Sequence, residues 1–554
     1  MDENEKILKL AERYFKSEDQ LGPTSATSLG NHEHDGELED LSSSGLSRMK
    51  STCKSFRKEL GEVNFDKLDS DEKIKYHILD SGIKSTEMFF NETRQFERDP
   101  AFYTDIATSS IYLLLIRDFA PIEERLRSAI SRLNKIPDLY ESARKNIGTP
   151  PKVFTQVALD VLKGANSLFE DLIPKMASKV PSLEEEVNKA AQNAKKATDE
   201  YREFLEKDVF PRSNGDFAVG SKLMDRMLLE NDFLDHTSED LWKIGLRELE
   251  ICEKELEEFC RKNMDPHKTW RENYLKVKEH HPTSDKILDT YTKCLKNARD
   301  FVIKHDLITI PENQKVIPMA TPEFQRSVVP LAAYHPPAPY ENDLTGYLLV
   351  TPIDPDQSQE AKEHQLKDNC FGKIQYVSLH ECYPGHHLQL VYHSNLEDPV
   401  IKRKMSNIFI EGWAFYTEQL LKDYGYFDNE GHLCQLEASY WRALRILLDV
   451  GLHTGKFDFD GALEFMQSKT DWSPFIAMGE LKRYTRTPTQ ALSYYTGKLE
   501  IFKIKRDYEK KVGNKFSLKK FHEDLLSCGS MPPKLIEWKL GLREIESPVV
   551  PVVG

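Results

Sequence analysis

The residues with the clearest chemical potential lie in one short segment, YVSLHECYPGHHLQLVYH, which holds His380, Glu381, His386 and His387. In an HExxH helix, two histidines four residues apart share a zinc ion, and the glutamate between them can deprotonate the attacking water. Here the second histidine comes six or seven residues after the first. On a regular helix, at about 100° per residue, position i+6 points about 120° away and position i+7 lies about 10 Å along the axis. An unbroken helix would therefore not bring two of these imidazoles to one metal.

The dipeptide Pro384-Gly385 lies between the histidines and resolves this difficulty. Proline removes a backbone donor and clashes with the preceding turn, whereas glycine allows unusual backbone angles. If the pair bulges outward, the chain gains two residues without advancing the helix. His386 then takes the place of an i+4 histidine, and we favour it as the second ligand, with His387 as the alternative.

A catalytic zinc site needs a third protein ligand and an open position for water. Glu411 follows His386 by 25 residues (411 − 386) in NIFIEGWAFYTEQL, which allows a second helix to pack beside the first. Glu418 is the alternative ligand, although an exposed or capping role suits it better. Structural zinc sites favour cysteine and four protein ligands, so we expect one catalytic Zn²⁺ per chain, in a site that could also take Mn²⁺ or Co²⁺.

Hydrophobic periodicity predicts helices for most of the chain. Apolar residues fall on one face between 122 and 133, Ser182 and Glu185 form a capping box, and Thr237 or Ser238 begins another long helix. Short, Pro-punctuated, β-rich segments between about 306 and 353 predict a small sheet just before the metal-binding helix. The expected fold is mainly α, with a helical N-terminal lobe (1–305) and a catalytic lobe (306–554) that form one integrated fold. The histidine-rich loop at 32–35 is expected to be solvated and not metal-binding.

Composition narrows the class of protein. Lys and Arg number 76 against 91 Asp and Glu, a formal net charge of −15, which argues against nucleic acid as the main partner. We find no apolar run long enough to span a membrane and no basic, apolar signal peptide at the N-terminus. The eight cysteines are scattered and form no CxxC pair, so a reducing, cytoplasmic location is expected.

Four motifs carry a resemblance to a known family: HECYPGHHLQ, EGWAFYTEQL, RALRILLDVGLH and RYTRTPTQALSYYTG. They resemble, in order, those of domain of unknown function 885, whose members are regarded as zinc metallopeptidases similar at the active site to the angiotensin-converting-enzyme and thimet-oligopeptidase group. The segment GPTSATSLGNHEHDGELEDLS resembles the start of that family, so the likeness spans nearly the whole chain. It implies a large helical two-lobed fold around a deep cleft and hydrolysis of peptides or related amides.

The resemblance also implies roles for single residues. His380 and His386 (or His387) match the histidines of the family motif, Glu381 its catalytic glutamate, and Glu411 its downstream ligand. The family's PGQA-like motif reads PTQA here, with Thr489 where glycine is usual, and Gln490 in it is a candidate substrate-binding residue.

The oxyanion that forms during hydrolysis needs a donor besides the metal. The candidates are phenols: Tyr494, which we favour by analogy with similar zinc peptidases, Tyr484 as the catalytic alternative, and Tyr495 as a substrate-binding group; at least one of the three is expected to be an ordinary core or cleft-lining aromatic.

Other side chains are candidates for holding the substrate. Arg483 or Arg486 could clamp a substrate carboxylate or form an internal ion pair. His453 could donate to the substrate, and Asp449 could orient a ligand histidine. The strand Thr345 to Pro352 could pair with a substrate backbone as an edge strand or be an ordinary buried strand.

Three functions remain open. The first is zinc-dependent hydrolysis of short peptides, as a carboxypeptidase or dipeptidase. The second is a metal-dependent amidohydrolase of a small non-peptide amide. The third is a non-catalytic helical binding protein with a vestigial metal site, against which the retained Glu381 argues. Neither the oligomeric state nor the end preference can be read from the sequence.

Overall fold

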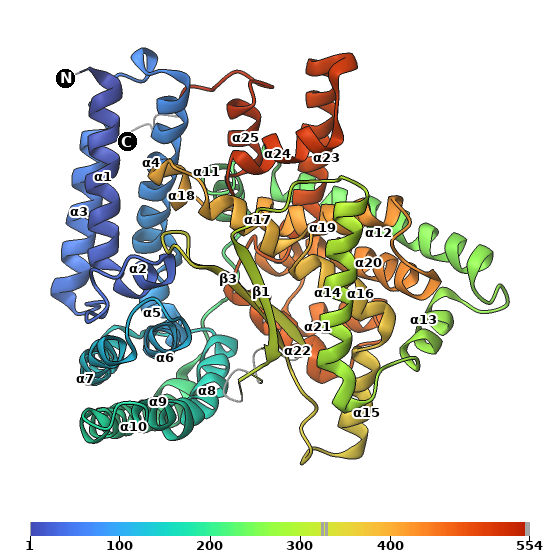
Figure 1. Cartoon of the computed structure of the whole chain (residues 1–554). Coiled ribbons are helices and arrows are strands. Elements are labelled where there is room, and N and C mark those ends of the chain that lie inside the picture. Colours follow the sequence, from blue (N-terminus) through green and yellow to red (C-terminus); the bar gives the residue numbers. More distant parts are fainter. Residues whose placement is uncertain (1, 323–325, 327–328, 330, 549–554) are drawn as a thin grey trace. The chain divides into compact units, whose positions relative to one another are not determined.

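A computed structural model of the chain describes residues 2–322, 326, 329 and 331–548, and helices make up most of it (Figure 1). The predicted mainly helical class is confirmed. By packing, the chain forms two compact units. The first comprises Met1–Val219, Ala338–Asn342 and Ile545–Gly554, and the second comprises Gly220–Pro337 and Asp343–Glu544. The observed division at Val219 therefore differs from the boundary expected near residue 305.

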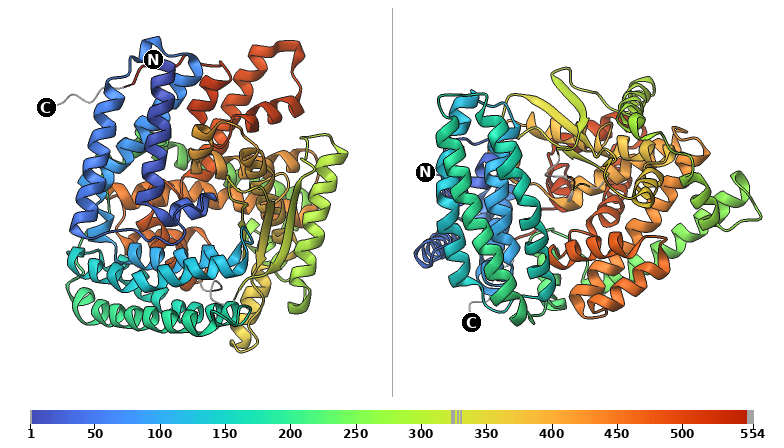
Figure 2. Two further views of the ribbon diagram at one scale, coloured as in Figure 1. Left: turned by 60° about the vertical axis from the view of Figure 1, so that its left-hand side comes forward. Right: turned by 90° about the horizontal axis from the view of Figure 1, so that it is seen from below.

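The regular structure of the first unit is helical over its described residues, with one isolated β-bridge between Pro151 and Gly215. Its helices are α1 (Glu3–Leu21), α2 (Pro23–Leu29), α3 (Ser43–Gly61), α4 (Ser70–Met88), α5 (Gln95–Arg98), α6 (Pro100–Ile116), α7 (Ile122–Asn146), α8 (Lys152–Ser167), α9 (Ile173–Ala177) and α10 (Glu184–Phe204). In α7, Leu126, Ala129, Ile130 and Leu133 are buried as their spacing predicts. This face meets α6 and α10, and α10 runs alongside α7 (Figure 2).

Two local expectations for this unit are wrong. The helix α10 begins at Glu184, and its N-cap residue, Leu183, makes no side-chain cap, so Ser182 forms no capping box. Three glutamates in the first turn interact favourably with the helix dipole instead. The segment around His32 is not simply solvated, because its Nδ1 lies 2.9 Å from the buried Asp35 and its ring stacks on Phe119.

The second unit holds the remaining helices and all three strands. The helices are α11 (Ser221–Glu230), α12 (Ser238–Asn263), α13 (Trp270–Lys278), α14 (Ile287–Lys304), α15 (Gln359–Asp368), α16 (Phe371–Glu381), α17 (His386–Ser394), α18 (Pro399–Arg403), α19 (Asn407–Asp423), α20 (Asn429–Thr454), α21 (Phe459–Lys469), α22 (Pro474–Arg486), α23 (Ser493–Val512), α24 (Leu518–Ser527) and α25 (Pro533–Lys539). The helix α12 begins where the sequence predicts, with Thr237 as its N-cap, and Thr237 forms a capping box with Asp240.

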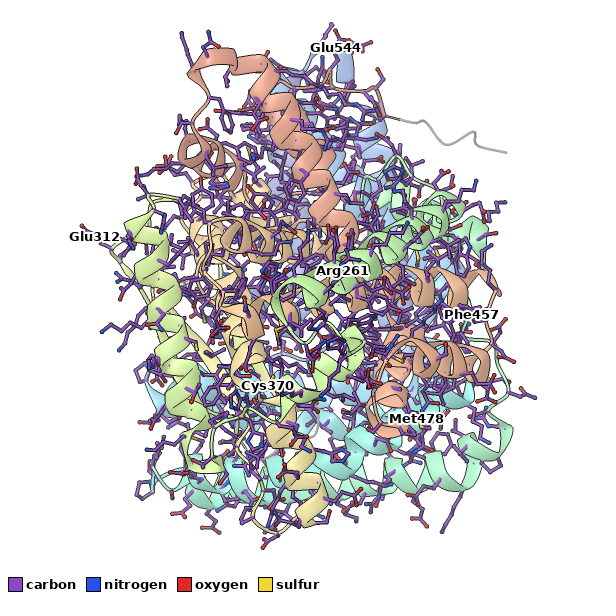
Figure 3. All side chains as sticks on the ribbon, turned by 90° about the vertical axis from the view of Figure 1, so that its right-hand side faces the viewer. Arg261, Glu312, Cys370, Phe457, Met478 and Glu544 are labelled. Carbon is purple, nitrogen blue, oxygen red and sulfur yellow. The ribbon has the colours of Figure 1, made fainter. Side chains whose placement is uncertain are left out.

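Packing explains why the boundary falls before α11. The long helix α12 lies along α20, and α14 lies along α16, so the helices of residues 221–304 share a core with the second unit. Cys370, labelled in Figure 3, lies where α16 begins, and side chains fill the space between these helices. None of the helices in the described part of the chain is both long and apolar enough to cross a bilayer.

The predicted small sheet is present between residues 314 and 350. It consists of β1 (Gln314–Ala320), β2 (Ala332–His335) and β3 (Leu344–Val350), in the order β1-β3-β2. The β1 strand pairs with β3 in parallel, and β2 pairs with it antiparallel. The β3 strand is therefore central. Its backbone has partners on both sides over residues 347–350, whereas residues 344–346 pair only with β1 among the described strands. Of the two expectations for this segment, the ordinary buried strand is the one observed over residues 348–350.

Candidate metal centre

The helix carrying the first histidine is interrupted where the sequence predicts a bulge. Between α16 and α17, the amide of Gly385 donates to the carbonyl of Leu379 at 3.0 Å, and that of Leu388 donates to Cys382 at 3.2 Å. Each of these bonds spans six residues, whereas an α-helical bond spans four. The chain thus takes in two extra residues, and His386 begins a new helix in the place of an i+4 histidine.

Close backbone packing explains the glycine at this bulge. A Cβ atom on Gly385 would lie 1.8 Å from the carbonyl oxygen of His380, so no other residue fits without a shift of the backbone. The preceding Tyr383–Pro384 peptide is cis. The Pro384 carbonyl accepts a hydrogen bond of 2.8 Å from the indole of Trp413 on α19. The bulge is therefore held against the helix that carries Glu411.

Three predicted ligands converge at this bulge. Nε2 of His386 lies 3.3 Å from Oε2 of Glu411, and Nε2 of His380 lies 3.7 Å from the same oxygen. One potential ligand atom from each of the three residues lies within 4.8 Å of the others. Both histidines are buried, and Glu411 is half-buried. Helices α16, α17 and α19 each contribute one of these side chains.

The donor set fits a zinc ion. Two histidines and one glutamate form a typical catalytic zinc site. Oε2 of Glu411 is buried and accepts no hydrogen bond from the described residues. Burial alone would raise the pKa of Glu411, but the nearby imidazoles of His380 and His386 outweigh it and hold the pKa well below its usual value. The carboxylate is thus ionised, as a metal ligand must be.

His387 points to other partners. The hydroxyl of Tyr334 on β2 donates to its Nδ1 at 2.7 Å, and its Nε2 donates to the side-chain oxygen of Gln314 on β1. Burial lowers the pKa of His387 to about 3, so the ring is neutral. His386 is therefore the histidine that joins His380 and Glu411 in the cluster, whereas His387 connects α17 to β1 and β2 by hydrogen bonds.

Glu418 lies behind the cluster. Its Oε1 is 2.8 Å from Nδ1 of His380 and 3.1 Å from Nη2 of Arg442. Burial lowers the pKa of His380, but the neighbouring Glu411 and Glu418 raise it to about 9. A carboxylate on the far nitrogen of a ligand histidine fixes the ring's orientation and tautomer. Sequence reasoning named Glu418 only as an alternative ligand, and its contact with His380 is the relationship that was missed.

A cavity of about 220 Å³ opens beside His380. Glu381, the predicted general base, lines it together with Tyr494 from α23. The Tyr494 ring is nearly parallel to that of His380, at 14°, with ring centres 6.3 Å apart. The remaining lining residues are Lys373, Tyr376, Val377, Glu437, Ala438, Trp441, Arg442, Arg445 and Trp472.

The other two candidate tyrosines do not line this cavity. Tyr484 is fully buried, donates to Glu480 at 2.5 Å and accepts a 2.9 Å hydrogen bond from Arg445. Tyr495, one residue after Tyr494, turns to the opposite side of α23 and donates to Glu248 on α12 at 3.0 Å. Both are structural, which agrees with the expectation that at least one phenol belongs to the core.

Arg483 on α22, a predicted substrate-binding residue, forms hydrogen bonds with other side chains of the protein. Arg483 donates to Glu480 at 2.8 Å and to the side-chain oxygen of Gln490 at 2.7 Å. Neither Arg483 nor Gln490 lines the cavity, and Arg486 also lies outside its lining. The internal ion pair that was the alternative for Arg483 is therefore the one observed.

Asp449 and His453 support the chain near α23 and do not contact the histidine cluster. The carboxylate of Asp449 accepts from the amides of Thr489 and Leu492, at 3.3 and 3.0 Å. Burial raises the pKa of Asp449 to about 7. Nε2 of His453 lies 3.0 Å from the carbonyl of Tyr484. The carboxylate that orients His380 is that of Glu418, not Asp449, because α20 turns Asp449 toward the loop that precedes α23.

Two arginines of the cavity were missed in the sequence. Arg442 and Arg445 lie three residues apart on α20, within the motif RALRILLDVGLH. Their i, i+3 spacing places them on one helical face, and this is the only local signal. The Arg445 guanidinium lies over the Tyr494 ring, with Cζ 4.6 Å from the ring centre, which connects α20 to the candidate oxyanion donor.

The helices carrying Glu411 and Tyr494 meet backbone to backbone. A Cβ on Gly412 would lie 2.5 Å from the backbone of Gly497, and a Cβ on Gly497 would lie 1.8 Å from the carbonyl oxygen of Ile408. Any larger residue would force α19 and α23 apart. The two glycines therefore determine how closely Tyr494 approaches the metal cluster.

The family of the chain follows from its sequence. The sequence profile described as "Bacterial protein of unknown function (DUF885)" matches residues 23–540. The chain therefore belongs to the DUF885 family, and the predicted family assignment is confirmed. None of the curated proteins matches the chain in sequence.

Two solved structures share the fold. A protein of unknown function from Shewanella oneidensis, described as a lipoprotein, is 26% identical, with a TM-score of 0.80 over 97% of this chain and 100% of that one. A protein from Colwellia psychrerythraea, also described as a lipoprotein, is 18% identical, with a TM-score of 0.82 over 98% of this chain and 100% of that one. The likeness to the second protein concerns the fold alone.

Proposed function

We propose that the protein is a zinc-dependent hydrolase of peptide bonds in short peptides. The observation that carries this proposal is the convergence of His380, His386 and Glu411 within 4.8 Å, beside a cavity that Glu381 lines. The three converging groups would hold one zinc ion per chain. Bound zinc would lower the pKa of a water molecule and polarise the scissile carbonyl.

The residues around this site support the reaction. Glu381 would take the proton of the attacking water and deliver it to the leaving amine, as a general base and then a general acid. Glu418 would hold His380 with its Nε2 directed toward Glu411. These roles need a carboxylate next to the first histidine and a second carboxylate behind it, and both are present.

The developing oxyanion needs a hydrogen-bond donor in the cavity. Tyr494 is the one predicted phenol in the cavity lining, and its ring is stacked near His380. Removing such a donor typically costs about 2.7–4 kcal/mol of transition-state stabilisation. Tyr494 is therefore the proposed oxyanion donor, in preference to Tyr484.

The similarity to the angiotensin-converting-enzyme and thimet-oligopeptidase group belongs to this proposal and rests on the residue motifs alone. The metal-dependent amidohydrolase remains the second candidate, because a cavity of about 220 Å³ is below the about 300–1,000 Å³ typical of drug-sized ligand sites. A cytoplasmic location also stays a prediction. The eight free cysteines support it, and the description of the similar structures as lipoproteins does not.

The test combines metal analysis with a peptide-library digest. Purified wild-type protein is expected to contain about one zinc per chain and to cleave short peptides that mass spectrometry identifies. Glu381→Gln should retain zinc and the fold but lose cleavage. Equal digestion by both proteins contradicts the general-base role, whereas turnover of acylated amino acids without peptide cleavage favours the amidohydrolase. A protein without metal or turnover would be the binding protein of the third hypothesis.

A further inference from the structure

The cavity beside Glu381 has a cationic side that the proposed chemistry does not use. Arg442 and Arg445 both line it, on the α20 face next to Tyr494. Arg442 is paired with Glu418 at 3.1 Å, which is itself bonded to His380. Arg442 is thus part of the support for the metal cluster, and Arg445 is the guanidinium left to meet a ligand.

The charge around Arg445 is not balanced locally. Arg445 and Arg483 share a single carboxylate, that of Glu480, at 3.2 and 2.8 Å. Tyr484, which also contacts this group, adds a hydrogen bond but no neutralising charge. The carboxylate of Glu411 also attracts Arg445, but it faces the imidazoles of His380 and His386. Two guanidinium groups therefore share the one carboxylate that contacts them directly, which favours an anionic ligand. On the other side of the lining, Lys373 is attracted by Asp368 and Glu437, and Glu437 also by Lys278 and Arg442, so these charges compensate one another.

The three guanidinium nitrogens of Arg445 differ in their hydrogen-bond partners. Its Nε donates to Tyr484, and its Nη2 donates to Glu480. Its Nη1 has no partner among the described residues, while the side chain lines the cavity. The Cζ atom lies 4.6 Å from the ring centre of Tyr494 and 5.2 Å from that of Trp441. The guanidinium is therefore held between two rings, with one edge left for a ligand.

An aromatic wall adjoins this edge. The rings of Trp441 and Trp472 lie with centres 4.1 Å apart, tilted by 45°, and both line the cavity. Indole rings offer a large rigid apolar surface to a neighbouring side chain. The volume of about 220 Å³ corresponds to roughly seven water molecules at about 30 Å³ each, which is enough room for one amino-acid residue.

We propose that this cavity binds the C-terminal residue of the substrate, with Arg445 donating to its free carboxylate and Trp441 and Trp472 contacting its side chain. This inference rests on the proposed function. It makes the substrates short peptides with a free carboxylate and an apolar or aromatic last residue, and it makes the activity that of a carboxypeptidase. Arg445 takes the carboxylate-binding role that the sequence assigned to Arg483 or Arg486.

The first experiment compares matched substrates. Peptides with one sequence, ending in phenylalanine as the free acid or as the amide, are given to the zinc-loaded protein. The wild type is expected to prefer the acid by about 10- to 100-fold in kcat/KM, the range for hydrogen bonds to charged groups. Arg445→Gln should lose this preference, mainly through KM. Arg445→Lys should keep part of it, because it retains the charge but loses the planar fork.

Arg483→Gln is the matched comparison, because it also removes a guanidinium from Glu480 but lies outside the cavity lining. It should retain a clear preference for the acid, because Arg445 keeps the Nη1 edge that faces the cavity, but the preference should be smaller than in the wild type, because Glu480 is then left to Arg445 alone. If Arg483→Gln abolishes the preference and Arg445→Gln does not, the assignment to Arg445 is overturned. If wild type cleaves acid and amide equally well, the C-terminal subsite is overturned while the peptidase function stands.

The second experiment needs no turnover. N-acetylphenylalanine and its amide are titrated calorimetrically into zinc-loaded Glu381→Gln protein, with and without Arg445→Gln. The acid is expected to bind, and either the amide modification or Arg445→Gln should weaken binding at least about tenfold. This result supports the subsite even if no peptide is cleaved. Absence of binding, or equal binding of acid and amide, overturns it. Zinc content and thermal unfolding establish that each variant is folded, and Arg445→Lys gives the test if Arg445→Gln does not fold.

Discussion

The carboxylate of Glu418 lies 2.8 Å from Nδ1 of His380, and both side chains are buried. This contact holds the His380 ring from behind and leaves its Nε2 directed toward Glu411. Outer hydrogen bonds of this kind commonly change metal affinity by about 10- to 100-fold. If the proposed zinc binds here, its affinity should therefore depend on Glu418, which is not one of the three converging residues.

Glu418→Gln is expected to lower zinc affinity by about 10- to 100-fold, because a neutral amide is a weaker acceptor for the His380 N–H than a carboxylate. Competition with a zinc chelator of known affinity measures the change. Asp423→Asn, at the exposed end of the same helix, is the control and should bind zinc like the wild type. Equal affinity of Glu418→Gln and wild type would remove Glu418 from the metal site.

Gly385→Ala is expected to damage the bulge, because its Cβ would lie 1.8 Å from the His380 carbonyl oxygen. We expect loss of zinc binding and a fall in unfolding temperature. Gly479→Ala, in the exposed part of α22, is the matched control: its Cβ meets nothing within 4 Å. Replacing a helical glycine there should stabilise the protein by up to about 1 kcal/mol. Normal zinc content in Gly385→Ala would refute the structural account of the bulge.

The two adjacent histidines should respond differently to substitution. His386→Ala is expected to lose zinc, and with it the rise in unfolding temperature that zinc gives the wild type by binding the folded state. His387→Ala should retain zinc but lose about 1–3 kcal/mol of stability, since the Tyr334 hydroxyl is left without its acceptor, whereas Gln314 keeps the hydrogen bond from Tyr383. Metal analysis and urea unfolding distinguish the two outcomes. The reverse pattern would make His387 the ligand.

Two buried histidines away from the cluster predict a pH dependence of stability. In His522, Nδ1 donates to the Leu307 carbonyl and Nε2 accepts from the Tyr416 hydroxyl, each at 2.8 Å. In His393, Nε2 donates to the Lys402 carbonyl and Nδ1 accepts from an amide. Burial lowers both pKa values to about 4, with a further small effect of Lys505 on His522.

These folded-state pKa values lie below that of an unfolded histidine, about 6.5. Between pH 6.5 and 4 the unfolded chain binds a proton that the folded chain does not. The free energy of unfolding is therefore not reduced by these histidines above pH 6.5. Below that pH it falls, by up to about 1.4 kcal/mol per pH unit for each histidine. In His522→Gln, urea unfolding across this range should give a slope smaller by about one proton. An unchanged slope would show that His522 does not titrate on unfolding.

The two histidines of the candidate metal centre could be predicted from the sequence because they lie close together in it. His380, Glu381 and His386 fall within seven residues, and Pro384-Gly385 announces the interruption between them. The start of α12 was equally readable, because Thr237 is a typical N-cap residue and lies directly before the helix. Where three or four neighbouring residues determine the geometry, pattern and physical chemistry are sufficient.

The predictions that the structure contradicts concern features that depend on packing between distant segments. Whether Asp449 faces a histidine or the amides before α23 depends on how α20 is rotated, and nothing near Asp449 reveals that rotation. The central place of β3 follows from the pairing of β1 across a long connection, and not from the strand's own residues. Ser182 and Glu185 have the spacing of a capping box, but the helix begins at Glu184, and its N-cap is Leu183 and not Ser182. Arg445 became a candidate only when its neighbours were known.

The contact between Gly412 and Gly497 has a consequence for how this family can vary. Each glycine is close in sequence to a proposed working residue, Glu411 or Tyr494, yet neither offers any reactive group. An added methyl at either position would change the spacing between two working side chains without touching them. Substitution of either glycine would therefore separate α19 from α23, and we expect it to impair the site as much as the loss of a catalytic group.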